Sequence, residues 1–130
     1  MANPQRKIPA PAPTPETEAF WSAAKEGKFM LRRCTACGKA HWYPRAICPY
    51  CMSDKTEWVE ASGRGKIYTF SVMRRAPEPY AIGYVTLEEG PSMLTNFVDC
   101  DFDKLKIGQS VKLKFMPTEG GPPVPMFAPA

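Results

Sequence analysis

Apolar and polar residues alternate with a period of two through most of the second half of the chain. The alternation runs through residues 67–73, 82–87, 93–98 and 111–116, and glycine or proline separates several of these runs. Such runs are typical of strands in a sheet with one buried face. A further run at 124–128 predicts a short last strand. Four or five short antiparallel strands in about 65 residues are typical of a small barrel, most simply a five-stranded OB-fold.

A different period near the N-terminus predicts one helix over residues 14–27. Thr14 is a suitable N-cap residue, Pro15 fits a first helical turn and Gly27 fits the end of the helix. The face that the helix would bury consists of Phe20, Trp21 and Ala24. Because a short amphipathic helix needs a surface to cover, we expect this face to pack within the chain rather than on another protein.

Proline marks the two ends of the chain. Of its 15 prolines, five lie in residues 1–15 and five in residues 117–130, and such segments bury little. The predicted fold is therefore mainly β with an N-terminal helix. Its order is a disordered or extended tail at 1–13, the helix at 14–27, a cysteine-rich module at 28–62, an OB-fold at 63–116 and a Pro-rich tail with the possible last strand at 117–130.

Four of the five cysteines form the pattern C-x2-C-x10-C-x2-C, namely Cys34, Cys37, Cys48 and Cys51. Two residues between paired cysteines let one tight turn, a knuckle, direct both thiolates at a single ion, and two knuckles complete a tetrahedral shell. Gly38 can adopt the left-handed conformation that closes the first knuckle. A closed four-thiolate shell has no open position for water or substrate, so the pattern predicts a structural Zn²⁺ and a zinc ribbon over residues 28–62.

Two other uses of these cysteines remain open at this point. Iron in the same shell would make the protein an electron carrier, and one C-x-x-C pair could be a thiol redox site. A ferric four-sulfur site absorbs visible light, whereas zinc is colourless.

The residues suited to catalysis are few. His41 is the only histidine, and we expect it to pack or to form a hydrogen bond, because four thiolates already complete the metal shell. Cys100 stands between Asp99 and Asp101, which would disfavour a reactive thiolate, so we expect a small buried side chain. The sequence has no G-x-S-x-G, Walker A or G-x-G-x-x-G motif. It predicts no catalytic residue.

A zinc ribbon joined to an OB-fold is also a frequent architecture of nucleic-acid-binding proteins, which makes that function the alternative. The formal net charge is only +4, and residues 63–130 contain eight basic against seven acidic residues. A nucleic-acid surface needs a continuous basic stripe. The alternation of Tyr68, Phe70 and Val72 predicts that they face the barrel interior rather than stack on bases. Binding to nucleic acid is therefore disfavoured.

No apolar run is long enough to span a membrane, and the N-terminus lacks the apolar region of a secretory signal. We therefore expect a cytoplasmic protein that does not enter the membrane.

The order of these motifs is similar to that of the DUF35 family of acyl-CoA-associated zinc-ribbon and OB-fold proteins. The resemblance covers about residues 18–116. Its motifs are Phe20-Trp21-x-Ala23-Ala24-x-Glu26-Gly27, Leu31-x-Arg33-Cys34-x-x-Cys37-Gly38, Pro44-Arg45-x-x-Cys48-Pro49-x-Cys51, Gly63-x-Gly65-x-Ile67-Tyr68-Thr69-Phe70, Pro79-Tyr80-x-Ile82-Gly83-Tyr84-Val85-x-Leu87 and Leu105-x-Ile107-Gly108-x-x-Val111.

The resemblance implies a helical N-terminal hairpin, a rubredoxin-like zinc ribbon and a C-terminal OB-fold. It also implies a non-catalytic subunit that assembles with a thiolase-superfamily enzyme (an acyl-CoA thiolase, an acyltransferase or an acyl-CoA side-chain aldolase) and helps to bind acyl-CoA or to stabilise the complex. For the CoA phosphates, Arg74 and Arg75 are candidates, because they lie in a proline-bounded loop and a guanidinium suits phosphate. A solvated basic loop is the competing interpretation.

Overall fold

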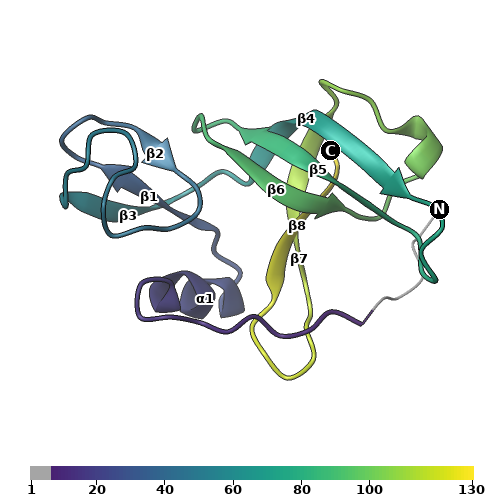
Figure 1. Cartoon of the computed structure of the whole chain (residues 1–130), viewed down its shortest axis with the longest axis horizontal. Helices are drawn as coiled ribbons and strands as arrows, with labels where there is room; N and C mark the ends of the chain where they lie inside the picture. Colours follow the sequence, from purple (N-terminus) through teal and green to yellow (C-terminus); the bar gives the residue numbers. More distant parts are fainter. Residues whose placement is uncertain (1–6) are drawn as a thin grey trace.

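The computed structural model describes residues 7–130 as a zinc-ribbon sheet, a barrel and one helix that lies beneath them in Figure 1. The mainly β fold and the five-stranded barrel predicted from the sequence are confirmed. The elements are α1 (Glu18–Lys25), β1 (Met30–Cys34), β2 (Ala40–His41), β3 (Thr56–Glu60), β4 (Arg64–Met73), β5 (Tyr80–Leu87), β6 (Ser92–Phe97), the 3-10 turn Phe102–Lys104, β7 (Ser110–Met116) and β8 (Val124–Pro129).

The helix α1 begins later than the sequence pattern predicts. Its N-cap is Thr17 rather than Thr14, and residues 14–17 form a turn in which the Thr17 N–H donates to the Thr14 carbonyl at 3.0 Å. The Glu16 carboxylate fixes this turn on the ribbon by accepting the Ala46 N–H at 2.6 Å. That bond is the main cause that lowers the pKa of Glu16. Among residues 7–130, this turn and an extended segment precede α1, so the helical hairpin implied by the family resemblance does not form here.

Aromatic side chains join the helix, the ribbon and the barrel into one core. Phe20 of α1 packs on Trp42 with ring centroids 5.1 Å apart, which confirms that the helix covers the chain itself. Phe29 lies between the ribbon and the barrel. Its ring centroid is 5.8 Å from that of Trp42 and 6.3 Å from that of Phe127 of β8. Edge-on aromatic pairs stabilise the fold beyond the contribution of the apolar area that they bury. This cluster therefore fixes the ribbon relative to the barrel.

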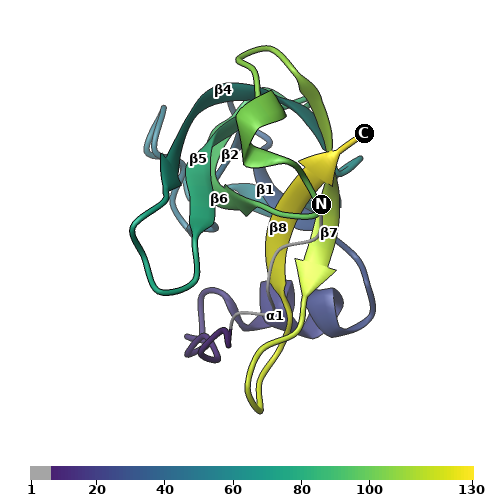
Figure 2. The same cartoon turned by 90° about the vertical axis from the view of Figure 1, so that its right-hand side faces the viewer.

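The barrel closes in the strand order β4-β5-β6-β8-β7, and Figure 2 shows these strands arranged around its axis. The last strand expected at residues 124–128 is β8. It pairs antiparallel with β7 along its length and contacts β6 in parallel at Phe97 and Phe127. The barrel is thus completed by residues beyond 116, inside the segment whose prolines suggested a tail. Barrel closure leaves no open sheet edge.

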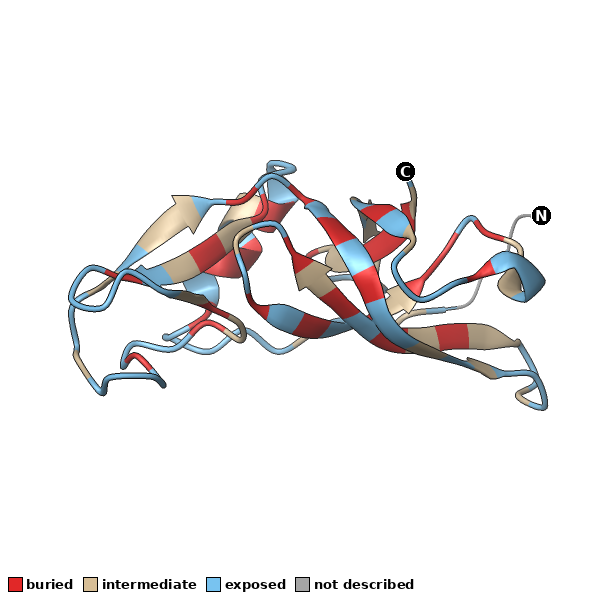
Figure 3. Cartoon of the chain, turned by 90° about the horizontal axis from the view of Figure 1, so that it is seen from above, coloured by how far each residue is buried: buried red, intermediate tan, exposed pale blue. Residues whose placement is uncertain are grey.

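A bulge in β4 overturns one prediction from the sequence. The pairing of β4 with β5 shifts between Ile67 and Thr69, so one extra residue reverses which side chains face inward. Ile67 is buried, Phe70 and Val72 pack against the core, and Tyr68 is 63% exposed. Gly83 of β5 permits the close approach of β5 to β4 at the bulge, because a Cβ at Gly83 would overlap the Thr69 carbonyl oxygen. Figure 3 shows buried and exposed residues alternating along the barrel strands.

The N-terminal tail is only partly described. Residues 1–6 of the tail predicted at 1–13 lie outside the described residues. Pro9 forms a parallel bridge with Glu119, and Ile8 packs against Val98, Met126 and Ala128, so the described part of the tail lies against the barrel. Within residues 7–130, no helix has the length and apolar character needed to cross a membrane.

Candidate metal centre

The four paired cysteines converge on one point of the ribbon. Their sulfur atoms all lie within 4.8 Å of one another. The Cys34 and Cys51 sulfurs are 3.6 Å apart, and those of Cys37 and Cys48 are 3.7 Å apart. Sulfurs bound at 2.3 Å around a tetrahedral ion would be about 3.8 Å apart, whereas a disulfide requires about 2.05 Å. The spacing fits a bound metal and excludes two disulfides.

Two knuckles of the same construction present the sulfurs. In the first, the Gly38 N–H donates to the Cys34 carbonyl at 2.8 Å; in the second, the Met52 N–H donates to the Cys48 carbonyl at 2.9 Å. Gly38 has φ +79°, as predicted for a knuckle-closing glycine, and Met52 has φ +66°. Backbone N–H groups also donate to sulfur. The Cys37 N–H donates to the Cys34 sulfur and the Tyr50 N–H to the Cys48 sulfur, both at 3.4 Å. Such donors stabilise thiolates.

Without a cation, the four thiols do not ionise together. The hydrogen bond from the Cys37 N–H lowers the pKa of Cys34 to about 7, although burial opposes it. The Ser53 N–H lowers the pKa of Cys51, but hydrogen bonds shared with Cys34 and the other thiols, together with burial, raise it to about 12. A cation is needed to bring all four into the thiolate form. Metal binding must therefore release protons.

The basic residues around the metal loops mainly brace these loops. Arg33 Nε donates to the Gly38 carbonyl at 3.1 Å, which supports the first knuckle. Arg32 lies 4.8 Å over the Trp58 ring and donates to Thr56. Arg45 pairs with Glu16 at 3.4 Å. These contacts tie the metal loops to the sheet and to the turn before α1.

The other two candidate reactive residues lie away from this centre. His41 is buried and is not part of the thiol cluster; its Nε2 lies 3.3 Å from the Arg45 carbonyl. Burial lowers the pKa of His41. Cys100 is buried in the barrel core, and burial raises the pKa of its thiol. Both environments match the packing roles expected of these residues.

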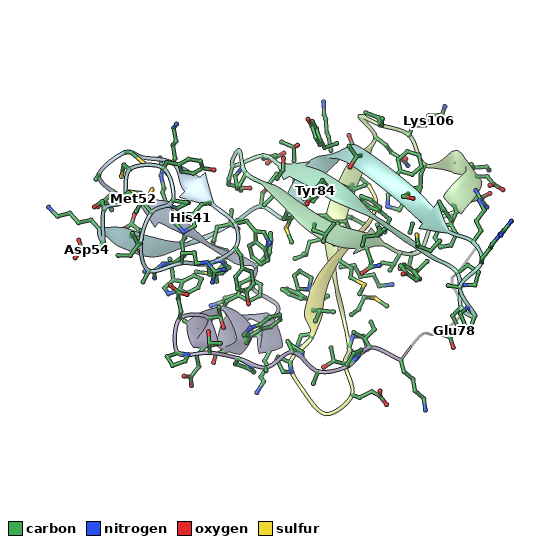
Figure 4. The ribbon with its side chains drawn as sticks, viewed as in Figure 1. His41, Met52, Asp54, Glu78, Tyr84 and Lys106 are labelled. Carbon is green, nitrogen blue, oxygen red and sulfur yellow. The ribbon has the colours of Figure 1, made fainter. Side chains whose placement is uncertain are left out.

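Arg74 and Arg75 lie in the turn between β4 and β5, at the end of the barrel away from the ribbon. Glu78, labelled in Figure 4, shares this turn. Arg74 forms an exposed ion pair with Asp103 at 2.7 Å, and Arg75 is exposed. Among residues 7–130, Arg75 forms no ion pair. The prediction that the two arginines contact CoA phosphates stays a prediction.

One surface was not found from the sequence. Tyr68, Tyr84 and Leu94 are exposed on β4, β5 and β6, and the last two are direct cross-strand partners. Tyr84 is labelled on the barrel in Figure 4. The feature of the sequence that could have revealed this surface is the complete absence of charged residues from 80–87 and 92–97.

Two domain families match adjacent stretches of the chain. Residues 21–57 match the rubredoxin-like zinc ribbon domain of ChsH2, and residues 58–116 match the C-terminal OB-fold domain of ChsH2. The zinc ribbon assignment agrees with the convergence of the four thiols.

Two relatives show how far the similarity extends. A probable enoyl-CoA hydratase alpha subunit of Thermomonospora curvata is 33% identical over 98% of this chain, and the chain spans 41% of that relative's length. A DUF35 domain-containing scaffold protein of Methanocaldococcus jannaschii is 38% identical over 73% of each protein.

A solved structure shares the whole architecture. It is titled Ltp2-ChsH2(DUF35) aldolase, and its matching chain superposes with a TM-score of 0.81 at 32% identity, covering 92% of this chain and 98% of the other. The order of ribbon and barrel, the four converging cysteines and these matches agree with the resemblance seen in the sequence. The chain belongs to the DUF35 family of zinc-ribbon and OB-fold proteins.

Proposed function

We propose that this protein is a non-catalytic, zinc-binding subunit that assembles with a thiolase-like acyl-CoA enzyme and helps it to bind acyl-CoA or stabilises the complex. The observation that carries the proposal is the extent of the structural match. The chain covers 98% of the DUF35 chain in the aldolase structure, with a TM-score of 0.81. This match supports a role like that of the aldolase-associated chain.

The metal in this proposal is Zn²⁺ held by Cys34, Cys37, Cys48 and Cys51. The sulfur separations of 3.6 and 3.7 Å support a tetrahedral ion, and the family assignment favours zinc over iron. When bound, the ion supplies folding energy to the ribbon rather than chemistry. The purified protein should therefore be colourless and contain one zinc per chain.

The barrel surface supports a protein partner. Strands β5 and β6 contain no charged residue, whereas 23% of the chain is charged. Their outer face instead exposes Tyr84 (45%) and Leu94 (52%) beside Tyr68. Protein interfaces are depleted of charge at their centre and enriched in tyrosine. A nucleic-acid surface would need cations among these aromatic rings, so the face argues against the alternative function.

For the CoA phosphates, Arg74 and Arg75 stay our candidates. Replacing both with Glu should weaken acyl-CoA binding by the complex roughly 10-fold, because two charge-assisted hydrogen bonds would be lost. The fold should survive, since both side chains are exposed. The matched control is Arg64→Glu, which reverses an exposed arginine elsewhere on the barrel. Titration calorimetry with acyl-CoA measures the difference, and equal affinities for the double variant and the wild type would dispose of this site.

The proposal as a whole is tested by an affinity pull-down of the tagged full chain from its native host, followed by mass spectrometry. We expect a thiolase-like acyl-CoA enzyme in near-stoichiometric amount. Recovery of nucleic-acid machinery in its place would revive the alternative function, and binding that weakens steeply with salt would identify it.

A further inference from the structure

The second knuckle of the metal centre ends in an exposed apolar tip. Ile47, Tyr50 and Met52, which we call the knuckle tip, are 45%, 54% and 75% exposed. Figure 4 labels Met52 at the end of the molecule opposite the barrel. Single exposed apolar residues are ordinary, but three within six residues of one loop form a patch.

The backbone at Met52 indicates that its side chain is not retained for folding. Met52 has φ +66°, a left-handed conformation that is strained for a residue with a Cβ. In the first knuckle, Gly38 occupies the same position at φ +79° without that strain. A glycine would therefore close the second knuckle better. Backbone strain at a residue whose side chain is 75% exposed points to a role of that side chain outside the fold.

The rim of the knuckle tip is mainly basic. The Lys39 ammonium lies 5.1 Å over the Tyr50 ring and holds that ring in place on the surface. Arg33 and Lys55 are also exposed on this end of the ribbon, against the carboxylates of Asp54 and of Glu57, the cross-strand partner of Arg33. An apolar centre with a positive rim is complementary to an apolar pocket with carboxylates at its edge.

We propose that the knuckle tip inserts into an apolar, acid-edged pocket on the acyl-CoA enzyme subunit, with Met52 as the central anchor. This inference rests on the proposed function and adds the part of this chain that holds the partner. The unbranched Met side chain adapts to an irregular pocket. Because the metal ligands Cys48 and Cys51 shape the knuckle, loss of the metal should also abolish this contact.

Substitutions at Met52 give stability and binding effects of opposite sign. In the full-length zinc-loaded protein, Met52→Gly relieves the backbone strain and should raise the thermal midpoint by about 3 °C. It should also weaken binding to the co-purified enzyme roughly 10-fold or more, because the anchor is lost. Met52→Ala keeps the strained backbone and should weaken binding equally, whereas Met52→Leu should retain most of the affinity.

Calorimetric scans and surface-immobilised binding assays measure the two effects. The proposal is overturned if Met52→Gly lowers the midpoint with unchanged affinity, because Met52 would then be structural. It is also overturned if the tip variants lose binding only to vesicles containing anionic lipid, which would make the tip a membrane anchor. If wild-type protein binds no acyl-CoA enzyme at all, the proposed function itself fails, and that result is separate from a loss confined to the Met52 variants.

Discussion

Replacing Cys48 with Ser is expected to release the zinc and to unfold residues 28–60. The ribbon has too small a core to fold alone, since its buried residues are Phe29, Leu31, Cys34, His41, Pro44 and Cys48. Zinc binding supplies on the order of 10 kcal/mol to domains of this kind. Cys34→Ser should have the same effect. Metal analysis and amide hydrogen exchange would show stoichiometric zinc loss together with faster exchange in β1 and β3, while the barrel strands stay protected.

The matched control for this experiment is Cys100→Ser, which alters a cysteine in the barrel core instead of the ribbon. It should lower stability modestly and keep one zinc per chain. Full zinc content in Cys48→Ser, or zinc loss with no change in exchange, would contradict the structural role of the metal.

The thiol pKa values predict how zinc affinity depends on pH. With the pKa of Cys51 raised to about 12, protons compete with the metal. Apparent affinity should therefore fall with every decrease in pH near neutrality, and more steeply below about pH 7, the pKa of Cys34, where that thiolate also takes a proton.

Placing carboxylates on the barrel face is the second change expected to have a large effect. The double variant Tyr84→Asp, Leu94→Asp puts two charges at directly paired positions of β5 and β6. Both side chains are about half exposed, so the fold should tolerate the change. If the partner covers this face as well as the knuckle tip, burial of unpaired charges should weaken assembly about 30-fold or more. Analytical size-exclusion chromatography with the co-purified enzyme would then show dissociation.

Ser110→Asp serves as the control for the barrel face. It adds a single carboxylate to an exposed strand position on β7, outside the β5 and β6 surface. This variant should assemble like the wild type. Intact complexes with the double variant would show that the uncharged face does not meet the partner.

The cysteine spacing contained nearly all the information needed to locate the metal centre. Because C-x2-C pairs fix their thiols through local turns, convergence of Cys34, Cys37, Cys48 and Cys51 followed from adjacent residues alone. The barrel strands were similarly visible in the two-residue period, including the closing strand β8. Local geometry decides these features, so a single sequence suffices to predict them.

Features that depend on distant residues were missed. The bulge after Ile67 reverses the facing of Tyr68, and nothing in the run of alternating residues marks it. The later start of α1 depends on Glu16, whose carboxylate reaches Ala46 of the ribbon, 30 residues away. The exposure of Tyr84 and Leu94 could not be distinguished from core packing by period alone.

We propose that this chain completes an acyl-CoA enzyme without performing its chemistry. The most direct test is turnover of acyl-CoA substrate by the co-purified enzyme, measured with this subunit present, removed and added back. We predict that the isolated subunit is inactive, that its removal lowers turnover at least about 10-fold, and that zinc-loaded subunit restores it. Turnover by the isolated chain, or an enzyme unaffected by its removal, would contradict the account.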